Sequence, residues 1–69
     1  MEEDIVVVGF GTAGYIEHVS KYGAEFKENA RNCAKQIRRN YKSVRIVTET
    51  EFQKLMEKDD ERRKEYWCY

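Results

Sequence analysis

The pattern of apolar residues predicts two short strands. Residues 5–8 are an unbroken β-branched run that follows an acidic start. Such a run is typical of a strand covered on both faces, because a strand with one face in water alternates apolar and polar residues. Residues 43–48 do alternate, and place Val44 and Ile46 on the apolar face of a second strand.

Between these strands, apolar residues recur at spacings of three and four, which predicts helix. An unbroken helix from Gly14 to Tyr41 would be about 40 Å long, whereas a compact domain of this size is about 28 Å across. We therefore favour a break at Gly23 over one long helix. The predicted apolar face comprises Tyr15, Ile16, Val19, Tyr22, Phe26, Ala30, Cys33, Ala34, Ile37 and Tyr41.

A final helix is predicted after residue 48. Thr48 and Glu51 match a capping box, and Val47 and Phe52 flank it as a hydrophobic staple. Residues 57–65 are all charged, which is typical of a solvated helix or a frayed tail. The inward face of this helix is expected to comprise Phe52, Leu55 and Met56.

These elements predict an α/β fold, a small β-α-(α)-β-α unit with a short two-stranded sheet. A helix between two strands favours parallel pairing with a right-handed crossover. The 69 residues form one domain, and residues 1–4 and 65–69 are expected to fray. Two strands without a crosslink give a marginal core. We therefore expect a homodimer, formed by sheet extension at an open strand edge or through the apolar helix face.

Composition narrows the class of protein. Lys and Arg number 13 and Asp and Glu 13, so the net charge is zero and the chain is no polycation. No apolar run approaches the ~20 residues that cross a bilayer, and the acidic N-terminus is unlike a secretory signal. Cys33 and Cys68 form no zinc set and no disulfide framework. We expect a cytoplasmic protein with reduced cysteines and no contact with a membrane.

Catalytic chemistry has few candidate residues. His18 is the only histidine, and helical spacing places no serine, cysteine or aspartate beside it. The chain also lacks a spaced set of metal ligands. We therefore expect a protein that is not an enzyme and that has no cofactor and no metal.

Gly9, Gly11 and Gly14 form a G-x-G-x-x-G segment after the first strand. This segment resembles the opening of a flavin- or NAD-binding Rossmann domain. The acid that ends the second strand, Glu49, comes 35 residues after Gly14, whereas the family has its ribose-binding acid about 20 residues on. The chain is also too short for a dinucleotide-binding fold. The remaining candidate ligand of the glycine loop is therefore a phosphate or another anion.

A second resemblance covers more of the chain. Residues 6–9, a helix rich in Lys, Arg and Ala, and residues 44–56 resemble the C-terminal half of a BRCT domain. In that family an acidic cap and a helix with an aromatic residue follow the second of these strands, and Phe52 occupies the aromatic place. The family's phosphate-contacting N-terminal half has no counterpart here, so the resemblance implies a fold and not phosphopeptide recognition.

Charged and aromatic residues suggest where a partner binds. Seven basic residues and one acid lie between residues 27 and 45, a stripe suited to phosphates or to an acidic partner. Aromatic residues at the C-terminus either cover the core or anchor a partner. The candidate interaction residues are Arg31, Lys35, Arg38, Arg39, Lys42, Tyr66, Trp67 and Tyr69.

We expect a small non-enzymatic protein-binding module. Accessory proteins of phages and mobile elements that modulate or inhibit a host partner are often of this type. The alternative is a phosphate or nucleic-acid binder that uses the glycine loop and the basic stripe. Salt separates the two, because binding to nucleic acid weakens steeply as salt rises.

Overall fold

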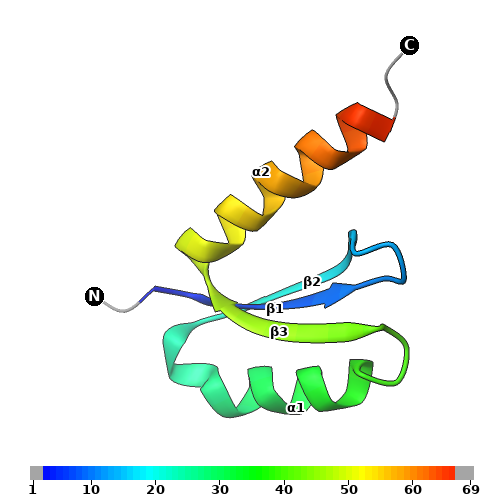
Figure 1. Ribbon diagram of the computed structural model, residues 1–69. Coiled ribbons are helices and arrows are strands. Elements are labelled where there is room, and N and C mark those ends of the chain that lie inside the picture. The colour runs from blue at the N-terminus through cyan, green and yellow to red at the C-terminus, as the bar shows by residue number, and fades with distance from the viewer. Residues whose placement is uncertain (1–2, 67–69) are drawn as a thin grey trace.

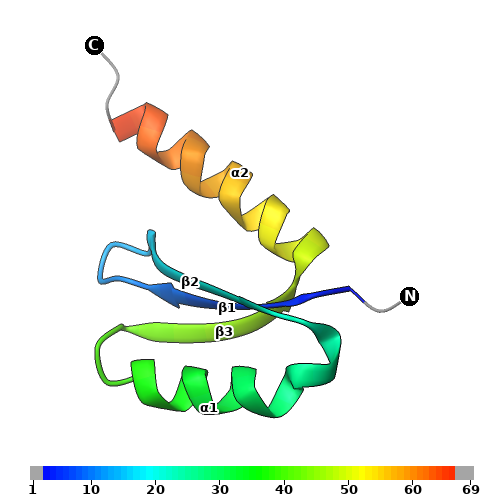
Figure 2. The ribbon, with the colours of Figure 1, turned by 180° about the vertical axis from the view of Figure 1, so that it is seen from behind.

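The computed structural model describes residues 3–66, and for residues 63–66 only the backbone. Within this range the elements are β1 (Ile5–Phe10), β2 (Ile16–Tyr22), a 3-10 turn (Ala24–Phe26), α1 (Lys27–Ile37), β3 (Ser43–Thr48) and α2 (Glu49–Tyr66). The strands form one sheet in the order β2-β1-β3. Helix α1 lies along one face of the sheet, and α2 rises obliquely from the other (Figure 1), as the view from behind also shows (Figure 2).

The predicted two-stranded parallel sheet is wrong. Strand β1 lies in the middle and pairs antiparallel with both neighbours. Strands β2 and β3 are therefore parallel to each other, with α1 connecting them and β1 inserted between them. The rule that a helix connects parallel strands does hold here, and the two strands to which it applies are β2 and β3. The prediction applied it to β1 and β3 because it assigned β2 to a helix.

A β-bulge explains why β2 resembles a helix in the sequence. The pairing moves from Gly9 opposite His18 to Phe10 opposite Ile16, so that Glu17 is an extra residue. Ile16 and Val19 consequently face the same side although they are three residues apart, a spacing typical of a helix face. The predicted break at Gly23 is present, but a strand and not a helix precedes it.

The glycine segment forms the turn of the β1–β2 hairpin. The backbone N–H of Gly11 donates to the carbonyl of Tyr15 at 2.9 Å, and that of Gly14 donates to the carbonyl of Gly11 at 3.0 Å. Gly14 has a φ of +85°, a conformation that side chains with a Cβ rarely adopt. The segment therefore leads into an antiparallel strand, and no helix begins at Gly14.

Small residues let α1 approach the sheet closely. Val7 is completely buried against Ala30 and Ala34, which lie one helical turn apart on α1. The half-buried Cys33 and Ile37 pack beside them, as the apolar period of this segment predicts. Phe26 departs from the predicted face, since it precedes α1 and is 49% exposed.

The other face of the sheet packs against the start of α2. Val6, Val8, Val47 and Phe52 form a buried cluster there. The predicted staple between Val47 and Phe52 is therefore confirmed. Met56, which was expected to face inward, is 50% exposed. The reason is that α2 leaves the sheet at an angle (Figure 1), so that Met56 faces a groove between α2 and β2 and not the buried cluster.

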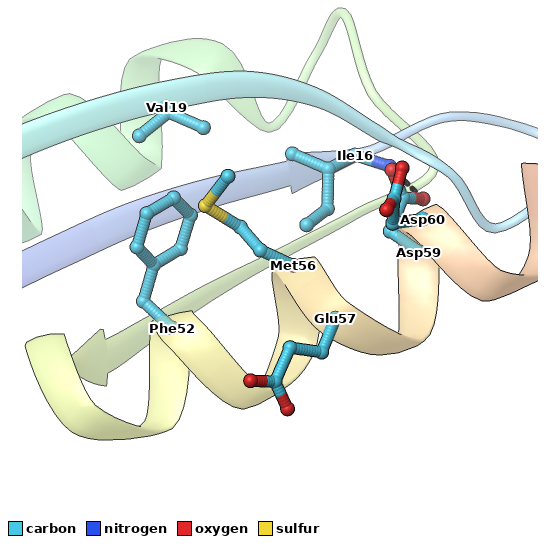
Figure 3. A pocket seen from close by; sticks show the side chains of 7 residues that line it. All are labelled: Ile16, Val19, Phe52, Met56, Glu57, Asp59 and Asp60. Carbon is cyan, nitrogen blue, oxygen red and sulfur yellow. Dashed lines mark hydrogen bonds between the residues drawn. The ribbon is translucent and has the colours of Figure 1, made fainter.

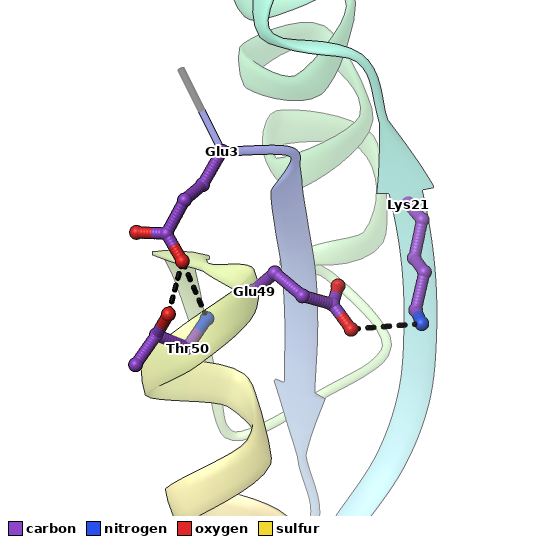
Figure 4. Close-up of polar contacts among 4 residues, drawn as sticks. All are labelled: Glu3, Lys21, Glu49 and Thr50. Atoms are coloured by element: carbon purple, nitrogen blue, oxygen red, sulfur yellow. Dashed lines mark hydrogen bonds and ion pairs between the residues drawn. The ribbon is translucent and has the colours of Figure 1, made fainter. Parts of the chain in front are cut away.

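Polar contacts fix the start of α2. The N–H of Glu51 donates to the hydroxyl of Thr48 at 3.3 Å, which is one half of the predicted capping box. The Glu3 carboxylate accepts from the backbone N–H of Thr50 at 3.2 Å and from its hydroxyl. Glu49 pairs with Lys21 of β2 at 3.2 Å (Figure 4). Carboxylates at a helix N-terminus are stabilising because they offset the helix dipole.

Candidate interaction surfaces

The five basic residues predicted as a stripe lie along α1 and the turn that follows it. Arg31 and Lys35 belong to α1, and Arg38 is its C-terminal cap. Arg39 and Lys42 lie in the connection to β3, where the N–H of Lys42 donates to the carbonyl of Phe10 at 3.0 Å. All five side chains are exposed. They do not share a single helix face, because α1 ends at residue 37. We call these five residues, on α1 and the turn after it, the basic face.

No carboxylate neutralises the basic face among residues 3–62, whose side chains the structure describes. Ion pairs in that range join Lys21 to Glu49 at 3.2 Å and Arg45 to Glu51 at 3.9 Å. The latter side chains are more than half exposed, so the pair contributes little. The basic face thus presents its charge to solvent and to a partner.

A hollow of about 330 Å³ adjoins the basic face at the edge of β3. Strand β3 pairs only with β1 in the described sheet, so its other edge is open. Ile46, at this edge, is 43% exposed. We call this the β3 hollow, and its lining residues are Ile5, Lys27, Arg31, Ile46, Val47, Thr48 and Glu51.

A second, more apolar groove of about 520 Å³ lies between β2 and α2. Val19 from β2 and Met56 from α2 face each other across it, with the Phe52 ring beside them (Figure 3). The Asp59 carboxylate accepts from the backbone N–H of Ile16 at 3.1 Å and joins the two walls at one end. We call this the β2–α2 groove, and it is lined by Ile16, Val19, Phe52, Met56, Glu57, Asp59 and Asp60.

Two features of the glycine loop oppose the binding of an anion. The N–H groups of Gly11 and Gly14 donate within the turn, so they are not directed to a ligand. A Cβ at Gly11 would lie 1.3 Å from a carboxylate oxygen of Glu17, which shows that this negative group packs against the loop. A negative charge there opposes the binding of a phosphate.

Two side-chain contacts were missed by the sequence prediction because β2 was taken for a helix. His18 Nε2 lies 2.7 Å from the hydroxyl of Ser20, and the imidazole lies 5.7 Å from the ring of Tyr41. Residues two apart share a face on a strand but not on a helix. At the end of the same face, a hydrogen bond with Cys33 raises the pKa of Tyr22.

Several expectations concern residues outside these surfaces. Trp67, Cys68 and Tyr69 lie outside the described residues, as does the side chain of Tyr66. Among the residues that are described, no helix is long and apolar enough to cross a membrane. Nor does any group of three or more His, Cys, Asp or Glu side chains in that part of the chain come together as a metal site.

The resemblance to the C-terminal half of a BRCT domain stays a prediction. A scan against protein-family models and searches of curated proteins and of solved structures found no match to this chain.

Proposed function

We propose that this chain is a non-enzymatic protein-binding module that takes an acidic segment of its partner along the basic face and the β3 edge. The observation that carries the proposal is the presence of five exposed, unneutralised basic side chains on α1 and the turn after it, of which Arg31 also lines the hollow at the open edge of β3. Charge of one sign attracts a partner of the opposite sign and sets its orientation.

The open edge of β3 supplies a way to hold such a segment. An extended peptide can add as a further strand, with its backbone paired to the edge and its alternate side chains on the two faces. On the α1 side, acidic side chains of the peptide would meet Lys27 and Arg31, and an apolar side chain of the peptide would pack over Ile46. On the other side they would meet Arg45, which faces away from α1. An acidic segment with an apolar residue at its centre fits this pattern.

A selection from a displayed library of short random peptides tests the proposal. We expect enriched peptides to be acidic with a central apolar residue. Replacing Arg31 and Lys35 together by glutamate should weaken their binding about tenfold or more in fluorescence anisotropy, a loss of about 1.4 kcal/mol or more. The matched control replaces Lys54 and Lys58, which are exposed on α2, by glutamate and should change the affinity little.

Two results would contradict this proposal. One is the enrichment of peptides without an acidic pattern. The other is an equal loss of binding in the α1 and α2 double variants, since an equal loss would mean that only the overall charge matters.

A nucleic acid is the second candidate ligand for the basic face. The observation in its favour is that α1 also exposes Asn32 and Gln36 between its basic residues, and amide side chains of this kind read base edges. Nucleic-acid binding would fall steeply between about 50 and 200 mM salt. It would also be unaffected by Ile46→Ala, whereas peptide binding at the β3 edge should weaken.

A further inference from the structure

We infer, on the basis of the proposed function, that the segment bound at the β3 edge has the motif acid-x-apolar-x-acid. Its apolar residue lies opposite Ile46, and both acids lie on the side of the sheet that α1 covers. Ile46 is in the middle of β3 and is 43% exposed. The β3 hollow brings it together with Lys27 and Arg31 of α1. The backbone and the charges at this edge both make Ile46 the centre of the bound segment.

The even-numbered residues of β1 direct their backbone groups towards β3. The carbonyl of Asp4, just before β1, accepts from the N–H of Glu49 at 3.1 Å, and that of Phe10 accepts from the N–H of Lys42 at 3.0 Å. In an antiparallel pair, positions that exchange hydrogen bonds alternate with positions that do not. The even-numbered residues between Asp4 and Phe10 therefore also point their N–H and C=O groups at β3.

Ile46 consequently directs its own backbone groups to the open edge. The two β3 residues that lie opposite Val6 and Val8 use their N–H and C=O groups in the pairing with β1. Ile46 lies between these two residues, so its N–H and C=O groups are available to an added strand. Ile46 lies opposite Val7, which packs against α1. Since directly opposed residues share a face of the sheet, the partner residue opposite Ile46 also lies on the α1 side.

Three basic residues form a line along the side of α1 that borders β3. Lys27, Arg31 and Arg38 are all exposed, and they fall within an arc of about 40° on a helix of 3.6 residues per turn. Arg38 belongs to this line because its dihedral angles are helical and its N–H donates to the carbonyl of Ala34 at 3.1 Å. Lys27 and Arg31 line the β3 hollow, which places the line beside the open edge.

The length of this line matches the motif. Helix α1 and strand β3 run in opposite directions (Figure 1), so Lys27 lies near the end of β3 and Arg38 near its start. Their Cα atoms are about 16 Å apart along the helix axis, and helical side chains lean towards the N-terminus, which brings the Arg38 side chain back along α1. The two acids of the motif are about 13 Å apart on a strand. One acid therefore lies beside Lys27 and the other beside Arg38, with Arg31 between them.

Acids directly beside the apolar residue would lie on the α2 side of the sheet. The charged side chains at that side of the β3 edge are Arg45 and Glu51, which lie 3.9 Å apart. A carboxylate there meets one positive and one negative charge, whereas on the α1 side it meets positive charges alone. The order of the side chains in the segment, and not only its net charge, therefore determines the affinity.

Two peptides of identical composition test the motif. Each contains a central leucine and two glutamates among serines. In one peptide the glutamates lie two positions from the leucine on either side, and in the other they lie directly beside it. The second peptide is the matched control, because its length, net charge and apolar content are the same. We expect the first peptide to bind the unmodified protein about tenfold more tightly in fluorescence anisotropy.

Charge reversal locates each acid of the motif. Lys27→Glu and Arg38→Glu should each weaken binding of the first peptide about tenfold, because each places like charges together. A lysine in place of one glutamate should restore binding to one of these variants, and a lysine in place of the other glutamate should restore binding to the other variant. The control variant is Lys54→Glu on α2, which should bind as the unmodified protein does.

The possible results separate the motif from the proposed function. Equal affinities of the two isomers, or lysine peptides that restore binding to neither variant, would overturn the motif and leave the proposed function intact. If neither isomer binds, the proposed function is contradicted and the motif with it.

Discussion

Phe52→Ala is expected to unfold most of the protein at 25 °C. Phe52 is only 4% exposed and packs with Val6, Val8 and Val47 on the α2 side of the sheet. Removing a buried phenylalanine side chain costs about 3–5 kcal/mol, and a core in a domain of this size rarely supplies more than about 3–5 kcal/mol in total. The Lys21 ammonium, 5.6 Å from the ring centre, would also lose its cation–π contact.

The control for this prediction is Phe26→Ala. Phe26 is 49% exposed and belongs to neither buried cluster, so its removal should cost about 1 kcal/mol or less. Far-ultraviolet circular dichroism and urea denaturation at one fixed protein concentration would measure both variants. Equal losses of stability in the two variants would show that the α2-side cluster is not the main source of stability.

Ala30→Leu is expected to lower the free energy of unfolding by about 1–3 kcal/mol. Ala30 has no exposed surface and lies against Val7 of the central strand, so a larger side chain must push α1 away from the sheet. Asn29→Leu is the matched control, because residue 29 is the preceding position on the same helix and is exposed. It should leave the urea midpoint almost unchanged. A tolerated Ala30→Leu together with a damaging Asn29→Leu would mean that α1 packs through another face.

The sequence allowed β1, β3 and the start of α2 to be predicted because local signals there agree with the tertiary contacts. In the run at residues 5–8, Val6, Val7 and Val8 are buried between two helices on the two faces of the sheet, which is why the run does not alternate. The staple at Phe52 likewise matches its surroundings. The predicted apolar face of β3 does not, because Ile46 is 43% exposed at the open edge while Val47, on the opposite side, is buried against α2.

Strand β2 could not be predicted in the same way. Its bulge at Glu17 puts Ile16 and Val19 on one face at helical spacing, and its open edge gives no further apolar signal. Missing β2 changed the predicted pairing from antiparallel to parallel and hid the contact between His18 and Ser20.

The candidate surfaces were predictable to different degrees. The residues of the basic face follow from the sequence, because exposed basic residues need no tertiary partner to be recognised. The β2–α2 groove does not, since it depends on β2 being a strand and on the angle at which α2 leaves the sheet. Met56 is apolar and at helical spacing, yet it lines this groove and is not part of the core.

The most direct test of the proposed function is a nuclear magnetic resonance titration of the ¹⁵N-labelled protein with an acidic, extended peptide. We predict that backbone amide shifts change along β3, around Ile46, and on the outer side of α1, around Arg31 and Lys35. The amides of β2 should stay unchanged. Shifts confined to β2 and α2, or no shifts with any acidic peptide, would contradict the assignment of the basic face and the β3 edge as the binding surface.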